Sequence, residues 1–130
     1  MPKRILIIED DKFISDLYDF AFSKSDYIVD HAMDGEIAIQ KATIETYDVI
    51  LLDIMLPKVT GIDVLRRIRT TENPSKKTPV ILSTNLAEDK IINEAMSLGA
   101  NGYILKAELE PTDVVKKVND ILQNLKPFSF

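Results

Sequence analysis

The residues from Tyr47 to Pro57 constrain the fold of this chain most strongly, because they join an apolar run to a single carboxylate. The run, Val49 to Leu52, shows no alternation of polar and apolar side chains. Such a run is typical of a strand that is buried on both faces of a parallel sheet. Asp53 follows directly, and ligands of open α/β sheets bind outside the carboxyl ends of the strands. The stretch therefore predicts a buried strand that presents an acid to a crevice.

Four more apolar runs alternate with amphipathic stretches along the chain. The predicted strands cover residues 5–8, 27–32, 49–52, 80–82 and 103–105. Apolar residues at helical spacing predict a helix after each strand, the fourth from about Ala87 to Leu98 with Gly99 as its cap. The fifth helix is expected to begin at Pro111. This alternation predicts an α/β fold, a doubly wound parallel sheet of five strands with five helices on its two faces.

The composition excludes several classes of protein. With 130 residues the chain has the size of one domain, which we expect to span residues 1–126, with a short tail at 127–130. A net charge of −5 and the lack of a basic stripe argue against nucleic-acid binding. There is no cysteine, hence no disulfide or thiolate metal site. No stretch resembles a signal peptide or a membrane span, so we expect a cytoplasmic protein without a membrane partner.

Groups that could bind or react follow four of the five predicted strands. Glu9 and Asp10 follow the first strand and Asp53 the third, while Thr84 follows the fourth and Lys106 the fifth. In a parallel sheet these ends lie on the same edge. Converging carboxylates raise at least one pKa unless a cation lies among them. Carboxylate oxygens without histidine or cysteine suit Mg²⁺, so we expect this ion as a cofactor.

A divalent ion beside a carboxylate, a hydroxyl and an ammonium is suited to phosphoryl transfer. Asp53 is the predicted nucleophile because it is central and has no acidic neighbour in the sequence. Glu9 and Asp10 are predicted to hold the metal. Lys106 would neutralise charge on the phosphoryl oxygens, and Thr84 would donate a hydrogen bond to one of them.

Four segments carry a resemblance to a known family: ILIIEDD, YDVILLDIMLP followed by Gly61, PVILST, and GANGYILK. Through them the chain resembles the receiver domain of bacterial two-component response regulators, in the single-domain form of the chemotaxis regulators. The resemblance implies a flavodoxin-like fold with strand order 2-1-3-4-5. It also implies that Asp53 accepts a phosphoryl group from a sensor histidine kinase or phosphotransfer protein. Mg²⁺ would bind Asp10, Asp53 and the backbone carbonyl of Met55, and Glu9 would reach it directly or through water.

The resemblance further implies a switch. Tyr103 matches the aromatic position that turns inward when Thr84 moves towards the phosphate. A downstream protein effector is then expected to dock on the fourth helix, the fifth strand and the fifth helix. Met55 and Leu86 match positions that modulate hydrolysis, and because both are apolar we expect slow self-dephosphorylation. Enzyme activity would be limited to phosphorylation and dephosphorylation of Asp53 itself, without a separate substrate.

Two positions depart from the family pattern. Ala107 follows Lys106 where the family usually has a proline after a cis peptide bond, so this peptide is expected to be trans, or cis at a cost of roughly 3 kcal/mol. Asn85 follows Thr84 where a small residue is common, and would narrow access to Asp53 or donate an extra hydrogen bond. The departures keep an alternative function open, a pseudo-receiver that acts as a protein interaction module without phosphorylation.

Other charged residues have ordinary structural interpretations. Arg66, Arg67 and Arg69 predict a solvated face of the third helix and not a DNA contact. His31, the only histidine, lies within the second predicted strand, away from the acids. It is expected to be a partly exposed strand residue and not a metal ligand.

Overall fold

The computed structural model describes residues 2–85 and 89–125. Within them, five parallel strands form one sheet in the order β2-β1-β3-β4-β5. The strands are β1 (Lys3–Ile8), β2 (Tyr27–Ala32), β3 (Val49–Asp53), β4 (Val80–Thr84) and β5 (Gly102–Leu105). The helices are α1 (Lys12–Lys24), α2 (Gly35–Ile44), α3 (Gly61–Thr70), α4 (Asp89–Ser97) and α5 (Pro111–Leu125), with a 3-10 helix η1 (Lys106–Glu108). The predicted α/β fold and strand order are confirmed.

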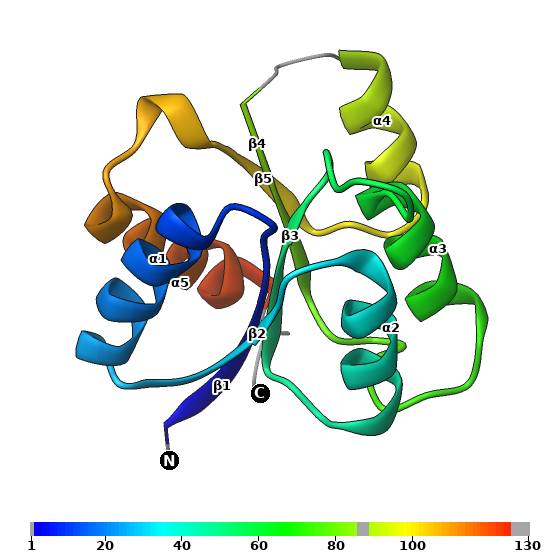
Figure 1. The fold of residues 1–130 in the computed structure, drawn as a ribbon, viewed down its shortest axis with the longest axis horizontal. Coiled ribbons are helices and arrows are strands. Elements are labelled where there is room, and N and C mark those ends of the chain that lie inside the picture. Colours follow the sequence, from blue (N-terminus) through cyan, green and yellow to red (C-terminus); the bar gives the residue numbers. More distant parts are fainter. Residues whose placement is uncertain (1, 86–88, 126–130) are drawn as a thin grey trace.

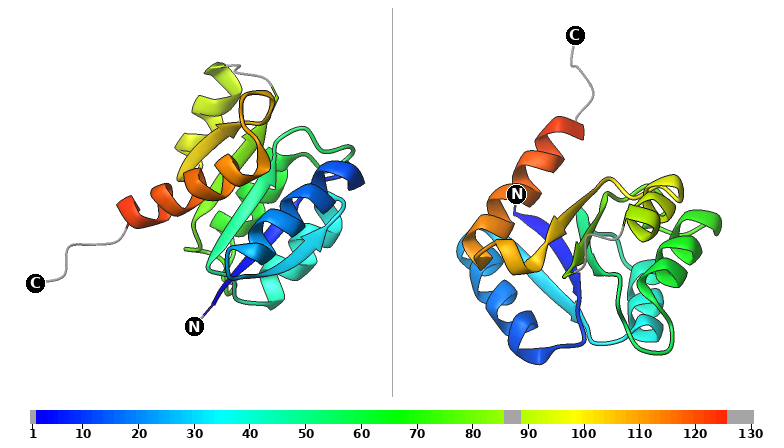
Figure 2. Two further views of the ribbon diagram at one scale, coloured as in Figure 1. Left: turned by 90° about the vertical axis from the view of Figure 1, so that its left-hand side faces the viewer. Right: turned by 90° about the horizontal axis from the view of Figure 1, so that it is seen from above.

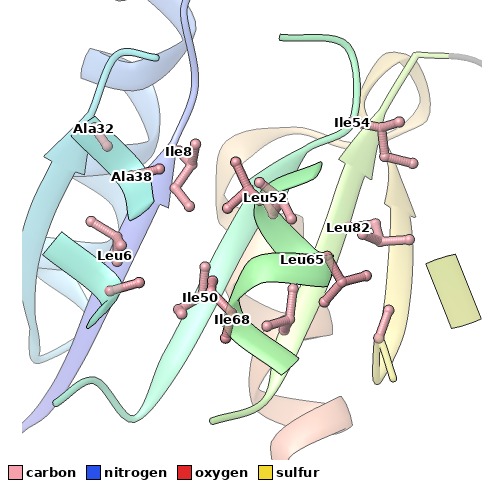
Figure 3. Packing of buried hydrophobic residues seen from close by; sticks show 14 of the residues in the cluster. Leu6, Ile8, Ala32, Ala38, Ile50, Leu52, Ile54, Leu65, Ile68 and Leu82 are labelled. Atoms are coloured by element: carbon pink, nitrogen blue, oxygen red, sulfur yellow. The ribbon is translucent and has the colours of Figure 1, made fainter. Parts of the chain in front are cut away.

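Helices cover both faces of the sheet (Figures 1 and 2): α1 and α5 lie on one face, and α2, α3 and α4 on the other. Every residue of β3 is buried, as its uninterrupted apolar run predicts. Successive side chains of a strand point to opposite faces, so β3 contributes to two cores. Ile50 and Leu52 pack in the core under α2, α3 and α4 (Figure 3), and Val49 and Leu51 in the core under α1 and α5. The central strand is therefore fixed from both sides, and Asp53 is held at its end.

Side-chain caps determine where three helices begin. The Asp11 carboxylate accepts hydrogen bonds from the backbone N–H groups of Phe13 and Ile14 at the start of α1. Asp34 caps α2 in the same way, and Thr60 forms a capping box with Asp63 at the start of α3. Such caps satisfy N–H groups that have no partner within the helix. α1 therefore begins directly after the acids Glu9 to Asp11, and orients the loop that carries them.

Gly61 fixes the loop that follows Asp53. A Cβ atom at this position would lie 2.4 Å from the backbone oxygen of Asp53 and 2.6 Å from Cα of Ile54. The backbone N–H of Gly61 instead donates a hydrogen bond of 3.0 Å to the Ile54 carbonyl. Only glycine permits this approach, so the start of α3 packs closely against the end of β3.

Several local predictions need correction. Arg69 is not part of a solvated face: its guanidinium donates to the carbonyls of Gly99 and Lys76 and to the side chain of Asn101, whereas Arg66 and Arg67 are exposed as predicted. β4 is two residues longer than predicted and includes Thr84, and η1 was not predicted.

Gly99, with φ of 104°, follows α4 as the predicted cap. The predicted start of that helix, Ala87, lies outside the described residues. The peptide bond after Lys106 is trans, since the described residues contain no cis peptide. None of the helices described is long and apolar enough to cross a membrane.

Candidate functional site

The carboxyl edge of the sheet brings most of the predicted site residues around one cavity of about 320 Å³. It is lined by Glu9, Asp10, Asp11, Ile14, Asp53, Met55, Asn85 and Lys106. Thr84 is also at this edge, as the last residue of β4, but it is buried and does not line the cavity. The strand ends therefore converge as the sequence predicts, with Thr84 set below the surface.

Two of the acids are deeply buried and share one cation. Glu9 is 2% exposed and Asp53 4% exposed, whereas Asp10 is exposed. The ammonium of Lys106 lies 2.5 Å from Oε1 of Glu9 and 3.1 Å from Oδ2 of Asp53. Two carboxylates and one ammonium leave a surplus of one negative charge in the interior, a costly arrangement without a further cation.

Backbone donors hold the other oxygens of these carboxylates. The N–H of Met55 donates to Oδ1 of Asp53 at 3.0 Å, and the N–H of Asp11 donates to Oε2 of Glu9 at 3.2 Å. The contribution of Asp11 was missed in the sequence. Its signal was present, since a capping aspartate directly after two acids places its own backbone N–H next to them. Both buried carboxylates are therefore oriented before any ligand binds.

The electrostatics of the site follow from burial and mutual repulsion. Burial raises the pKa of Glu9 to about 7; the hydrogen bond from Lys106 opposes this rise, and the charge of Asp53 adds to it. For Lys106, burial lowers the pKa, but the hydrogen bond to Glu9 and the charge of Asp53 outweigh burial and raise it. Lys106 therefore keeps its proton at neutral pH, and Glu9 is the group that resists ionisation.

The acids also have the arrangement of a cation site. Glu9, Asp10 and Asp53 each offer one carboxylate oxygen, and these three atoms lie within 4.8 Å of one another. Hard oxygen donors with surplus negative charge fit Mg²⁺, which binds through a few carboxylates and retains several waters. The residues present thus fit the predicted ion in type, spacing and charge.

The remaining predicted residues lie at or near this edge or outside the described part of the chain. Asn85 lines the cavity and is exposed, and Tyr103 is 44% exposed on β5. Leu86 lies outside the described residues. His31 is partly exposed, as predicted, and lies against α1, where it contacts Ser15 and Asp19.

A family model described as the response regulator receiver domain matches residues 5–119. The chain belongs to this family. Receiver domains are phosphorylation-dependent switches of two-component systems, and they are phosphorylated by histidine kinases. The resemblance seen in the four sequence segments is therefore confirmed at the level of the family.

Two curated relatives come from Bacillus subtilis (strain 168). The transcriptional regulatory protein ResD is 33% identical over 127 residues, which are 98% of this chain and 51% of ResD. The alkaline phosphatase synthesis transcriptional regulatory protein PhoP is 36% identical over 125 residues, 95% of this chain and 50% of PhoP. The chain thus spans about half the length of these transcriptional regulators. The prediction that this receiver domain itself contacts no nucleic acid remains a prediction.

Solved structures agree with the family. The chemotaxis response regulator CheY4 of Vibrio cholerae superposes with a TM-score of 0.85 at 25% identity, covering 93% of this chain and 99% of CheY4. The receiver domain of sensor histidine kinase PA1611 from Pseudomonas aeruginosa PAO1 superposes with a TM-score of 0.82 at 25% identity, covering 95% and 99%. That structure is described with a magnesium ion coordinated in its active site cleft.

Proposed function

We propose that this chain is a signalling switch that accepts a phosphoryl group on Asp53 in the presence of Mg²⁺. The observation that carries the proposal is the pair of buried carboxylates, Glu9 and Asp53, which share one ammonium, that of Lys106, among the residues that the structure describes. An ion pair that served stability alone would balance its charges, because an uncompensated buried charge is destabilising. A site for a metal ion and a phosphoryl group instead needs several acids around one lysine.

Glu9, Asp10, Asp53 and the backbone carbonyl of Met55 would hold the ion. The support is the spacing of the three carboxylates around the cavity. When bound, Mg²⁺ would neutralise negative charge on the phosphoryl oxygens.

The chain's own residues orient the nucleophile. The Met55 N–H fixes Oδ1 of Asp53, which leaves Oδ2 on the side of Lys106. In the transfer, a bond forms between the Asp53 carboxylate and phosphorus, the P–N bond of a donor phosphohistidine breaks, and the imidazole leaves with that electron pair. Lys106 would move its hydrogen bonds from the carboxylates to a phosphoryl oxygen, and the Thr84 hydroxyl would bind another. The product is an acyl phosphate on Asp53.

The proposed phosphodonor is a sensor histidine kinase or a phosphotransfer protein, and the proposed output is a protein effector that docks on α4, β5 and α5. In support, a groove of about 470 Å³ runs between these elements, lined among others by Met96, Tyr103 and Ile121. Met96 is 40% exposed and Tyr103 44% exposed, so both are accessible to a partner. A movement of Thr84 towards the phosphate would open space for Tyr103 to turn inward and change this groove.

The proposal is tested by intact-mass spectrometry after incubation with acetyl phosphate and Mg²⁺. The expected result is one added phosphoryl group on the wild type, and none on Asp53→Asn or in the presence of a chelator. A folded wild type that gains no phosphoryl group from this donor or from a histidine kinase would contradict the proposal and favour the pseudo-receiver function.

A second experiment tests the slow self-dephosphorylation. It compares the decay of the adduct in wild type and in Met55→Asn, and a polar residue at position 55 should accelerate this decay.

A further inference from the structure

A serine hydroxyl without a hydrogen bond lies directly behind the site. Ser83 is 2% exposed, and its Oγ is the one buried side-chain polar atom in residues 2–85 and 89–125 without a hydrogen-bond partner. A buried hydroxyl left without a hydrogen-bond partner destabilises the fold. Such groups are rare in native proteins, and each one calls for a structural or functional explanation.

The register of the sheet places this hydroxyl next to the nucleophile. Asp53 of β3 pairs with Ser83 of β4, so the two side chains leave the sheet on the same face. Ile81, two residues earlier on β4, belongs to the core under α1 and α5. The Ser83 side chain therefore points towards α1 and α5, behind the carboxylates of the site.

Tyr18 of α1 covers the same position. It is 5% exposed and belongs to the same core as Ile81. Its phenol is close enough to interact with the Ser83 hydroxyl, although no hydrogen bond of full geometry forms there. Burial raises the pKa of Tyr18; the Ser83 hydroxyl and the Lys106 ammonium oppose the rise, and the charge of Glu9 adds to it. The phenol thus remains protonated and lies within the electrostatic field of the site.

We propose that Tyr18 and Ser83 form a buried polar layer that positions Lys106 for phosphoryl transfer. An ammonium has three N–H donors, and the carboxylates of Glu9 and Asp53 occupy two of them. When Lys106 turns to the phosphoryl group, the Tyr18 oxygen accepts the third N–H, and the Tyr18 hydroxyl donates to Ser83 Oγ. Both hydroxyls thereby gain partners in the reacting state. This inference rests on the proposed function of Asp53, and it assigns Tyr18 and Ser83 as positioning residues, not catalytic ones.

Two measurements on full-length variants test the inference. The first is the rate of phosphoryl uptake from acetyl phosphate as a function of donor concentration. Tyr18→Phe should lower the maximal rate about fivefold, because the loss of one ordinary hydrogen bond in the reacting state corresponds to that ratio. The donor concentration at half-maximal rate should not change. Tyr27→Phe is the matched control, because Tyr27 belongs to the same core but donates to Asn119 away from the site. It should leave the rate unchanged.

The second measurement is NMR of the lysine ammonium groups in protein saturated with Mg²⁺ and beryllium trifluoride, a phosphoryl analogue that binds a carboxylate without a transfer step. Lys106 is assigned from Lys106→Arg. Solvent exchange of the Lys106 protons should be faster in Tyr18→Phe than in wild type and in Tyr27→Phe. This readout needs the analogue but no phosphoryl transfer: if the wild type accepts no phosphoryl group from a donor, the proposed function fails, while ammonium exchange in the analogue-loaded protein still decides the role of Tyr18. Unchanged exchange in Tyr18→Phe would overturn the inference.

Ser83→Ala tests whether the Ser83 hydroxyl helps to position Lys106 or has no role in phosphoryl transfer. It removes a hydroxyl that has no hydrogen bond, so the variant should be at least as stable as wild type. The proposed layer requires that its rate of phosphoryl uptake nevertheless falls. A more stable Ser83→Ala protein with the wild-type rate would overturn the inference.

Discussion

Two of the regions in which this molecule pairs a lysine with an aspartate or glutamate are built in opposite ways. The ammonium of Lys41, on α2, lies 2.7 Å from Oδ1 of Asp30 on β2. The other oxygen of Asp30 accepts a hydrogen bond of 2.7 Å from the Tyr47 hydroxyl. One acid thus meets one base, and each carboxylate oxygen has a partner. At the carboxyl edge, two buried acids share Lys106.

The pKa values show the consequence. Burial raises the pKa of Asp30, but the hydrogen bonds from Lys41 and Tyr47 outweigh burial and lower it overall. For Glu9 burial dominates, and the pKa rises to about 7. The same residue types therefore stabilise the fold where their charges balance, and lie at the proposed binding site where they do not.

The largest effect should be the pH dependence that Glu9 causes when no Mg²⁺ is present. Its folded-state pKa is raised from 4.5 to about 7, so its contribution to stability is fully present below pH 4.5 and is lost as the pH rises through 7. The loss is on the order of 3 kcal/mol. Urea unfolding in chelator between about pH 5 and pH 8 measures it. In Glu9→Gln, the free energy of unfolding should depend much less on pH in this range. If its pH dependence equals that of the wild type, the raised pKa does not belong to Glu9.

Removing Asp30 from its balanced pair with Lys41 should lower the free energy of unfolding by slightly less than the pH effect of Glu9. Asp30→Ala leaves the buried Tyr47 hydroxyl and the Lys41 ammonium without their acceptor, so the free energy of unfolding should fall by about 2 kcal/mol. Urea unfolding at neutral pH measures the change. Asp16→Ala is the control, since Asp16 contacts Lys12 on the exposed surface and such pairs contribute little. Equal effects of the two substitutions would mean that Asp30 acts as an ordinary surface charge.

Removing a charge from the site should increase the free energy of unfolding, the opposite of the effect of Asp30→Ala. Without Mg²⁺, Asp53→Asn removes the surplus charge while Glu9 keeps its contact with Lys106, so the protein should gain about 1 kcal/mol of stability. The gain is read from urea unfolding in chelator at a pH above 7, where Glu9 is ionised. A loss of stability in Asp53→Asn would show that the two acids do not repel one another as described.

The smallest effect should be the contribution of Asp30 to the loss of stability at acidic pH. It is small because 29% of the Asp30 side chain is exposed, and solvent screens its ion pair. A lowered folded-state pKa means that its contribution is present above the unfolded value and is lost as the pH falls through the folded one. Stability below about pH 4 should therefore fall less steeply in Asp30→Asn than in wild type. If the two proteins lose stability equally steeply at acidic pH, the pKa of Asp30 is not lowered in the folded state.

The sequence predicted the parts of this structure that depend on local pattern. The strand over residues 27–32 has the predicted bounds, and Asp53 stands at the end of a buried strand because an unbroken apolar run leads to it. Glu9, Asp10 and Lys106 line one cavity because parallel strands end on one edge.

What the sequence could not predict depends on contacts between distant residues. Arg69 was assigned to a solvated face because its acceptors on Gly99 and Asn101 are 30 and 32 residues away. Tyr18 fits an apolar helical pattern, and its interaction with Ser83, which pairs with Asp53, depends on how α1 packs on the sheet. Periodicity identifies the face on which a side chain lies, but the polar groups it meets depend on strand order and register.

The measurement that tests the central claim most directly is thermal unfolding with and without Mg²⁺, in wild type and in Asp53→Asn. If the surplus charge of Glu9 and Asp53 forms a cation site, saturating Mg²⁺ should raise the wild-type midpoint by about 4 °C or more, and raise that of Asp53→Asn far less. A wild-type midpoint that does not respond to Mg²⁺, or an equal shift in both proteins, would contradict the claim that this edge of the sheet is built to hold a cation.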